Sequence, residues 1–393
     1  MNFDEIVAEE NQYLMSTYGR FPVVLESGQG CTLTDIQNKK YLDLTSGIGV
    51  NSLGHNHPEI VKTIESQAKK CLHVSNLYYT QPMIEVAKFL VEKGNMKKVF
   101  FANSGAEANE GMIKVARKYS FDKYGKNRNK ILTLKQSFHG RTMATLTATG
   151  QDKFHNYFYP FMDGFDYIKA NDIGDLYDHL DDSVCGIMME LVQGESGVIP
   201  LDYDYVSKVA CLCKEKDILL MVDEVQTGIG RCGTLFVYEQ YDIQPDLVSL
   251  AKGLGSGIPV GAFMASEKCK DVLSKGDHGT TFGGNPLSCA VAKTVLSIVS
   301  DPSFLQDVKK KGEYFMEQIQ KIDSKIIKEV RGKGLMIGIV VDENQRMSLI
   351  NQLLKDGLLV LSAGKDVIRL LPPLIITYEQ INEAVEKMKG VFL

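Results

Sequence analysis

Ile218-Leu219-Leu220-Met221-Val222-Asp223 places five apolar residues in a row directly before an acid. A run of this kind is typical of a strand that is buried on both faces of a sheet. Similar runs recur between residues 98 and 265, and helical patterns alternate with them: Val99–Phe101, Ile131–Leu134, Gly186–Leu191, Leu247–Leu250 and Val260–Met264. This alternation predicts an α/β fold in which a mostly parallel sheet carries helices on both faces.

The pattern changes after Asn285-Pro286, which supply a cap and a first-turn proline for a helix. From there to the C-terminus the sequence predicts helices over 303–322, 347–355 and from 378, and strands over 334–341, 358–361 and 367–371. The first 45 residues also carry strand patterns. We therefore predict a large domain over residues 46–285 and a smaller α+β domain built from residues 1–45 and 286–393.

The composition argues against several classes of protein. The chain has 393 residues, of which 44% are hydrophobic, and its 44 basic and 49 acidic side chains leave a net charge of −5. A slightly acidic chain does not favour nucleic acid as a partner, and no apolar run is long enough to span a membrane. The N-terminal residues lack the pattern of a secretory signal, and the eight scattered cysteines indicate buried thiols of a reducing compartment. We expect a cytoplasmic protein.

Polar side chains follow the apolar runs, at the edge of a parallel sheet where ligands bind. After the first run, Ser104 has the spacing of a helix cap, and the amides of Gly105 and Ala106 would lie at the start of that helix. A helix N-terminus can bind phosphate through its free N–H groups, although a merely well-capped helix is the alternative. The next strand end brings Phe138, a possible platform for a ring, and Arg141, whose guanidinium can clamp a carboxylate.

Asp223 and Lys252 follow the two central runs. A buried carboxylate needs a cationic partner, and one assignment accounts for all of these groups: an enzyme that uses pyridoxal 5′-phosphate. Lys252 would form the Schiff base with the cofactor, and Asp223 would keep the ring nitrogen protonated. The other predicted contacts are Ser104, Gly105 and Ala106 with the phosphate, Phe138 and Val225 with the two ring faces, and Gln226 with the ring hydroxyl.

Two further motifs suggest other chemistry. His55-Asn56-His57 could bind a metal, but no other cluster of ligands accompanies it, so we predict no metal site. Gly228–Gly233 matches the GxGxxG of nicotinamide dehydrogenases, yet it does not lead into a helix as that motif requires. A cofactor-binding sensor is the non-enzymatic alternative. Visible absorbance of a lysine-bound cofactor would reject the dehydrogenase, and bleaching by an amino donor would reject the sensor.

Five motifs together resemble class III (ornithine-type) aminotransferases, most of all the acetylornithine branch. They run in the family's order over nearly the whole chain: Phe101–Asn109, Phe138-His139-Gly140-Arg141-Thr142, Asp223–Gly228, Lys252-Gly253-Leu254-Gly255 and Thr280–Pro286. The resemblance implies a fold-type I transferase that depends on pyridoxal 5′-phosphate. It further implies a sheet of the seven-stranded type in the large domain and a homodimer with shared active sites.

The resemblance also implies site residues that the patterns alone do not give. It places Glu224 beside Asp223 in the cofactor-binding segment. Thr281 would bind the phosphate of the neighbouring subunit's cofactor, with Thr280 near the substrate. Arg141 would bind the α-carboxylate of the substrate.

The implied reaction turns on a second arginine. Arg369 would bind glutamate, and Glu195 would pair with Arg369 when a terminal amino group is transferred. Ornithine aminotransferases carry a tyrosine where this chain has Ile48, and an apolar residue suits an acylated nitrogen better. We therefore predict transfer of the terminal amino group of N2-acetylornithine to 2-oxoglutarate, as in arginine biosynthesis. Succinyl-ornithine, succinyl-diaminopimelate, ornithine and γ-aminobutyrate are the alternative donors.

Overall fold

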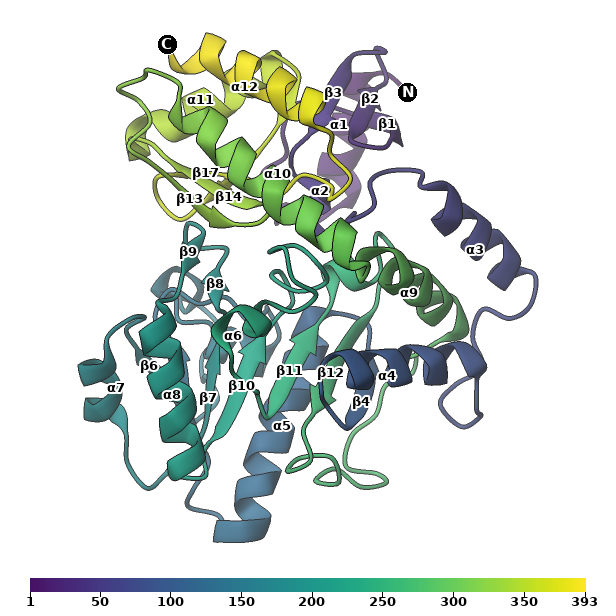
Figure 1. The fold of residues 1–393 in the computed structure, drawn as a ribbon. Helices are drawn as coiled ribbons and strands as arrows, with labels where there is room; N and C mark the ends of the chain where they lie inside the picture. Colours follow the sequence, from purple (N-terminus) through teal and green to yellow (C-terminus); the bar gives the residue numbers. More distant parts are fainter.

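The computed structural model describes residues 1–393 as a large α/β body with a smaller body stacked on it (Figure 1). The large body contains a seven-stranded sheet with the order β4–β12–β11–β10–β7–β5–β6. In that order the strands are Lys98–Ala102, Gly261–Ala265, Leu247–Leu250, Leu219–Asp223, Val184–Met189, Lys130–Leu134 and Phe165–Ile168. Only β12 runs antiparallel to its neighbours. The predicted mostly parallel α/β sheet is therefore confirmed, and β12 is the exception.

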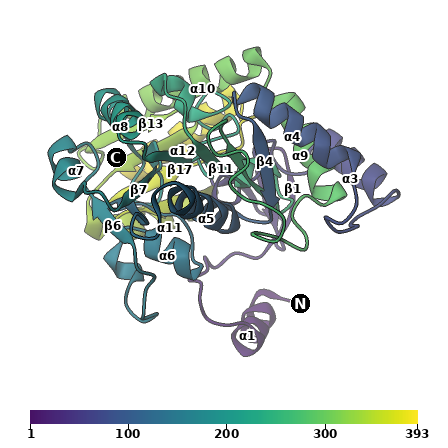
Figure 2. The same ribbon diagram turned by 90° about the horizontal axis from the view of Figure 1, so that it is seen from below.

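Helices cover both faces of this sheet. Figure 2 shows α5 (Gly105–Tyr124) nearly end-on against one face. On β10, Leu219 and Met221 pack in the cluster that α5 supplies, whereas Leu220 and Val222 belong to the main core on the other face. The remaining helices of this body are α3 (Pro58–Ala68), α4 (Gln81–Lys93), α6 (Met143–Ala148), α7 (Ile173–His179), α8 (Tyr203–Glu215) and α9 (Pro286–Val299). Successive side chains of β10 therefore point to opposite faces of the sheet, and residues two apart share a face.

The smaller body consists of two four-stranded sheets and three helices. One sheet joins β1 (Leu25–Gln29), β2 (Thr32–Asp35) and β3 (Lys40–Asp43) to β15 (Leu358–Leu359), and β3 pairs with β15 in parallel. The other sheet has the order β13 (Glu329–Lys333), β14 (Met336–Val340), β17 (Val367–Leu370) and β16 (Leu361–Ala363). The helices are α10 (Pro302–Gln320), α11 (Glu343–Lys355) and α12 (Tyr378–Phe392).

The division of the chain into 46–285 and 1–45 plus 286–393 stays a prediction, and two contacts bear on it. The pairing of β3 with β15 ties the N-terminal strands to the C-terminal part. Helix α9 begins where predicted, because the Asn285 side chain accepts a hydrogen bond from the Ser288 N–H at 2.8 Å. It packs against α3 and α4, however, so we propose that the second boundary falls after α9.

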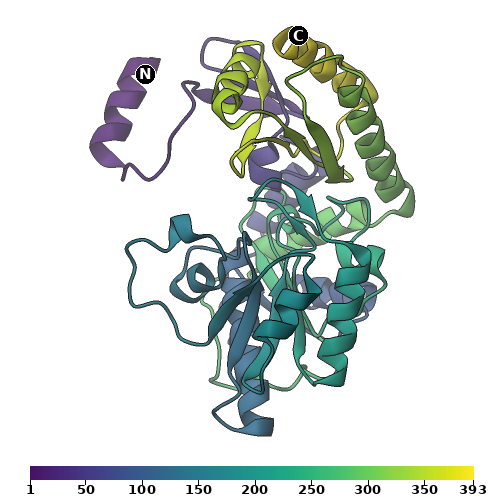
Figure 3. The ribbon, with the colours of Figure 1, turned by 90° about the vertical axis from the view of Figure 1, so that its left-hand side faces the viewer.

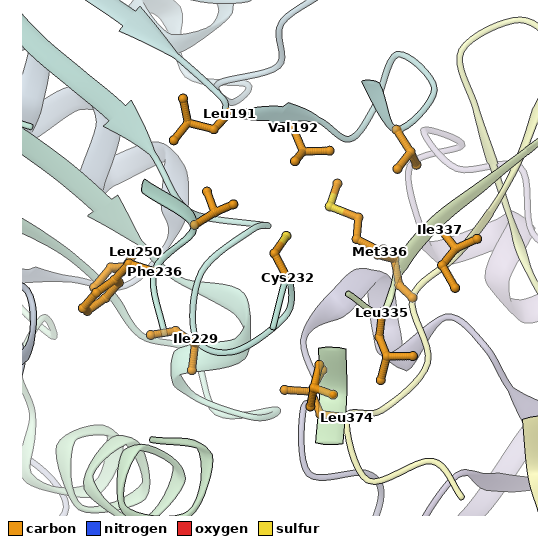
Figure 4. Packing of buried hydrophobic residues seen from close by; sticks show 14 of the residues in the cluster. Leu191, Val192, Ile229, Cys232, Phe236, Leu250, Leu335, Met336, Ile337 and Leu374 are labelled. Carbon is orange, nitrogen blue, oxygen red and sulfur yellow. The ribbon is translucent and has the colours of Figure 1, made fainter. Parts of the chain in front are cut away.

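A shared hydrophobic core joins the two bodies, and Figure 4 shows part of it. Leu191 and Val192, just beyond β7, belong to the same buried cluster as Met336 and Ile337 of β14. Because this core is continuous, it holds the residues of one body at a set distance from those of the other.

Arg231 lies in the same junction and is only 2% exposed. Its Nη1 donates to the carbonyl oxygens of Leu335 and Pro372 at 3.0 and 2.5 Å, and its Nη2 donates to Ser46 Oγ at 3.4 Å. Burial lowers the pKa of the guanidinium to about 10, so the group stays charged at neutral pH. One buried cation thus connects three segments of the chain.

The N-terminal helix α1 (Phe3–Tyr13) stands away from both bodies (Figure 3) and buries none of its residues. No helix of the structure is both long enough and apolar enough to cross a bilayer.

Candidate active site

A cavity of about 450 Å³ opens at the carboxyl ends of the central strands. Nine predicted site residues line it together: Ser104, Gly105, Ala106, Phe138, Arg141, Asp223, Val225, Gln226 and Lys252. They come from the segments after β4, β5, β10 and β11, as expected of an open α/β sheet.

The start of α5 forms one end of the cavity. Ser104 caps this helix, since its Oγ accepts a hydrogen bond from the Glu107 N–H at 3.2 Å. The N–H groups of Gly105 and Ala106 lie in the first turn, where a helix offers them no acceptor. A Cβ at Gly105 would lie 2.6 Å from Val225 Cγ1, so a larger residue would displace Val225. This end suits a phosphate, which needs free donors and a close backbone.

Asp223 lies at the bottom of the cavity, 3% exposed. Its Oδ2 accepts hydrogen bonds from Asn109 Nδ2 at 2.7 Å and from His139 Nδ1 at 2.8 Å. Its Oδ1 accepts the Val225 N–H at 2.9 Å. The sequence predicted a cationic partner for this acid, and within the chain only a histidine is near enough to supply one. The carboxylate is therefore oriented by three donors and can still receive a protonated ring nitrogen.

Lys252 follows β11 and has a left-handed backbone with a φ of 42°. Burial lowers the pKa of its amine, and the neighbouring charges of Glu195 and Arg369 act in opposite directions. A lowered pKa increases the neutral, nucleophilic fraction of a lysine amine.

Phe138 and Arg141 lie on one side of the cavity. The Arg141 guanidinium carbon is 4.0 Å from the ring centroid of Phe154 and 5.5 Å from that of Phe138. The side chain is exposed and forms no ion pair within the chain. The guanidinium is thus held by aromatic rings and remains free to bind a carboxylate.

Arg369 of β17, in the small body, reaches Gln226, which lines the cavity, and pairs with Glu195. Its Nη1 donates to Glu195 Oε1 at 2.7 Å, to the Gly194 carbonyl at 3.0 Å and to Gln226 Oε1 at 3.1 Å. Gln226 Nε2 donates in turn to Glu195 Oε1 at 3.3 Å. Burial raises the pKa of Glu195, but the charge and hydrogen bond of Arg369, the charge of Lys252 and the hydrogen bond from Gln226 together outweigh it, and the net pKa is lowered. Glu195 is therefore ionised at neutral pH and balances the guanidinium of Arg369.

Beside this pair, residues 46–49 turn with the opposite hand to an α-helix. Ser46, Gly47, Ile48 and Gly49 have φ values of 43°, 63°, 66° and 75°. Ile48 is 45% exposed in the single chain, and a Cβ at Gly49 would lie 3.9 Å from Gln226 Cγ. Ile48 lies two residues before Val50, which lines the cavity, and so stands near its border.

Five predicted site residues do not line the cavity of their own chain: Glu195 and Arg369, which form the ion pair beside Gln226, and Glu224, Thr280 and Thr281. Glu224 points away from it, since its carboxylate accepts the Tyr238 N–H at 2.9 Å and the Thr227 hydroxyl at 3.0 Å. Thr281 is exposed. Thr280 Oγ1 accepts hydrogen bonds from Asn103 Nδ2 at 3.1 Å and from the Gly283 N–H at 3.2 Å. Glu224 thus holds the segment after β10 from the side away from the cavity.

Residues 13–392 match the family model described as aminotransferase class-III. The chain belongs to the class III aminotransferases. It is 50% identical to an acetylornithine aminotransferase of Caldanaerobacter subterraneus subsp. tengcongensis over 388 residues, which cover 98% of both proteins. Two solved structures are also similar. An ornithine aminotransferase of Toxoplasma gondii has a TM-score of 0.96 at 31% identity and covers 100% of this chain and 95% of its own. An acetylornithine aminotransferase of Elizabethkingia anophelis has a TM-score of 0.89 at 33% identity, and the match covers 100% of this chain and 99% of that protein.

Class III aminotransferases use pyridoxal 5′-phosphate, and the residues of this cavity fit that cofactor. The free amides of Gly105 and Ala106 suit its phosphate, and the buried carboxylate of Asp223 suits its ring nitrogen. The Lys252 amine suits its aldehyde. The dehydrogenase alternative is rejected, because Gly228–Gly233 forms turns and leads into Val237–Tyr241, a short 3₁₀ helix. The structure contains no cluster of metal-ligating side chains, and His55 Nε2 instead lies 2.8 Å from Asp43 Oδ2.

Asn109, His139 and Glu190 are among the lining residues that the sequence patterns did not assign to the site. His139 lies within the predicted Phe138–Arg141 motif, and Asn109 lies one helical turn beyond the predicted helix start. Glu190 directly follows the buried strand β7, and that position was the available signal.

Proposed function

We propose that this aminotransferase moves the terminal amino group of N2-acetylornithine to 2-oxoglutarate, giving N-acetylglutamate 5-semialdehyde and glutamate. The observation that carries the proposal is the closed ion pair between Glu195 and Arg369. With Arg369 neutralised, Arg141 is left as the guanidinium for the single carboxylate of an ω-amino donor. Release of the pair provides a second cation for the second carboxylate of glutamate. One cavity can then serve both substrates, because a removable partner masks the extra charge.

Ile48 favours an acylated donor over ornithine. A free α-ammonium group at this border would have to lose water without gaining an acceptor, whereas an amide loses less. The names of the curated relatives, such as the one from Caldanaerobacter, agree with this choice. This donor also implies a role in arginine biosynthesis, and the eight free cysteines support a location in the reducing cytoplasm.

The residues of the chain divide the chemistry between them. Bound pyridoxal phosphate would supply the aldehyde that takes up the amino group and a ring that accepts electrons. Asp223 would hold a proton at the ring nitrogen, with Asn109 and His139 fixing its orientation. The Lys252 amine would hold the aldehyde carbon of the cofactor and, when free, would move a proton at the substrate carbon. Phe138 and Val225 would keep the ring plane fixed.

A homodimer would complete the cavity. Thr281 lies outside the cavity of its own chain, and the surrounding side chains Leu77, Tyr78, Tyr79 and Phe282 are 84%, 68%, 97% and 60% exposed. Apolar exposure on this scale is typical of a surface that another chain covers. A second copy would place its Thr281 on the phosphate and Thr280 near the substrate. Sedimentation should give twice the 43.7 kDa of one chain.

A panel of amino donors tests the reaction. The protein loaded with pyridoxal phosphate is mixed with N2-acetylornithine, N2-succinyl-ornithine, succinyl-diaminopimelate, ornithine or γ-aminobutyrate, and loss of the visible absorbance of the lysine-bound cofactor is followed. We expect kcat/KM for acetylornithine to exceed that for ornithine and γ-aminobutyrate by at least about tenfold, which corresponds to about 1.4 kcal/mol. The proposal fails if ornithine or γ-aminobutyrate reacts fastest, or if 2-oxoglutarate does not restore the absorbance.

A further inference from the structure

Glu190 occupies a position equivalent to that of Asp223 on the neighbouring strand. β7 and β10 are parallel, and Met188 aligns with Met221. Two residues further on, this register brings Glu190 next to Asp223. Met188 and Met221 both pack in the cluster on the α5 face, and side chains two apart on a strand share a face. Glu190 and Asp223 therefore project from the same face, and both line the cavity.

The carboxyl group of Glu190 is poorly satisfied within the chain. It is 6% exposed, and its only hydrogen bond is the one that Oε2 accepts from the Phe138 N–H at 2.9 Å. The other oxygen has no donor. Burial raises the pKa of this carboxyl to about 7. The charged and titratable groups around it are His139, Asp223, Glu195 and Lys252.

The order of the strands fixes which part of the cofactor Glu190 would face. The predicted phosphate site follows β4, the acid for the ring nitrogen ends β10, and Glu190 follows β7 on the far side of β10. Glu190 thus lies opposite the phosphate site. In pyridoxal phosphate the phosphate arm and the ring hydroxyl stand on opposite sides of the ring. Gln226, the residue predicted for that hydroxyl, already uses its oxygen and one N–H on Arg369 and Glu195.

We propose that Glu190 is a cofactor-binding residue which, as a neutral carboxylic acid, donates a hydrogen bond to the ring hydroxyl oxygen while its other oxygen holds the Phe138 main chain. The same side chain would then position the stacking ring and recognise the cofactor edge. An ionised Glu190 could not donate, and it would repel an oxygen that carries negative charge. The inference rests on the proposed positions of the phosphate and the ring nitrogen, but not on the identity of the amino donor.

The test measures binding of pyridoxamine 5′-phosphate, which has the same ring hydroxyl but no aldehyde to react with Lys252. Dissociation constants are determined for the full-length wild-type protein and for Glu190→Gln between pH 6 and pH 8.5. Glutamine keeps the shape, donates to the hydroxyl and accepts from Phe138, but it cannot ionise. We expect equal affinities near pH 6 and about tenfold weaker binding by the wild type at pH 8.5, since each pKa unit corresponds to a factor of ten.

Glu195→Gln is the matched control, because Glu195 is a carboxylate near the same cavity with a lowered pKa. Its affinity should differ from that of the wild type by the same factor at every pH. A ratio between the wild type and Glu190→Gln that does not change with pH would overturn the proposal. If neither protein binds pyridoxamine phosphate, the cofactor assignment itself fails instead.

Infrared difference spectra of the wild type give a second test that needs no variant. Addition of pyridoxamine phosphate at pH 8 should increase the carbonyl band of a protonated carboxylic acid, because binding favours the neutral form of Glu190. No increase would contradict the proposal.

Discussion

At the scale of single residues, the proposed choice of substrate depends on the pair formed by Glu195 and Arg369. The pair is held by a hydrogen bond of 2.7 Å, and Gln226 and the Gly194 carbonyl also accept from Arg369. Removal of the acid would therefore leave the guanidinium in place but uncompensated.

Glu195→Ala should shift preference toward glutamate. We expect the ratio of kcat/KM for glutamate to that for N2-acetylornithine to rise by about tenfold or more, because Arg369 would be permanently available for the second carboxylate. Stopped-flow traces of the two half-reactions measure the ratio. Glu329→Ala is the control, since it removes an exposed carboxylate from another arginine pair, and its ratio should equal that of the wild type. An unchanged ratio in Glu195→Ala would refute the proposal that Glu195 masks Arg369.

Glu224 should make the stability of the protein depend on pH. Burial raises the pKa of its carboxyl from 4.5 to about 7. The folded state thus holds the proton more tightly than the unfolded state. Its stabilising contribution is complete below pH 4.5 and is lost as the pH rises toward 7, by about 3 kcal/mol at 1.36 kcal/mol per unit. Urea unfolding of the cofactor-free protein should show this loss, and Glu224→Gln should reduce it. If the free energy of unfolding falls equally with pH in the wild type and in Glu224→Gln, the raised pKa does not belong to Glu224.

At the scale of elements, the position of the N-terminus of α5 depends on a close contact. Gly105 has no room for a Cβ because Val225 Cγ1 would be 2.6 Å away. Helix and strand end are therefore packed against each other at the point where the phosphate would bind.

Gly105→Ala should weaken cofactor binding without unfolding the protein. Alanine favours a helix more than glycine does, but its Cβ would move Val225 into the space of the ring. We expect about tenfold weaker binding of pyridoxamine phosphate and a melting temperature within a few degrees of the wild type. Gly390→Ala in α12, where nothing lies within 4 Å of the new Cβ, is the control and should leave the affinity unchanged. Equal affinity in Gly105→Ala would show that the contact has no role in binding.

The sequence predicted elements well where burial is uniform and less well elsewhere. Asp223 and Lys252 could be assigned because each directly follows an apolar run, and such runs are strands in a parallel sheet. The direction of β12 could not be predicted, because an apolar run does not encode its orientation. β6 was missed since Asp166 and Tyr167 interrupt its pattern. The contact between His139 and Asp223 joins residues 84 positions apart and has no local signal.

At the scale of the whole molecule, Arg231 connects the cofactor-binding body to both walls of the substrate site. It reaches Pro372, three residues after Arg369, and Ser46, which begins the turn that carries Ile48. One buried guanidinium thus ties together the segments that carry the proposed substrate residues Arg369 and Ile48.

Arg231→Met should destabilise the protein, because it leaves two buried carbonyl groups and a hydroxyl without their donor. We expect a loss of about 2 kcal/mol in the free energy of unfolding. Arg331→Met is the matched control, since Arg331 also binds carbonyl groups, those of Gly197 and Val198, but is only half-buried. Arg331→Met should lose less free energy of unfolding than Arg231→Met. If the two variants are equally stable, the junction does not depend on Arg231.

The turn at residues 46–49 has a consequence for the history of such enzymes. The side chain at position 48 stands on a left-handed turn and is largely exposed, so its chemistry can change while the framework stays intact. A single codon could then redirect the enzyme from one nitrogen donor to another, and closely related genes could diverge in metabolism without any drift in shape.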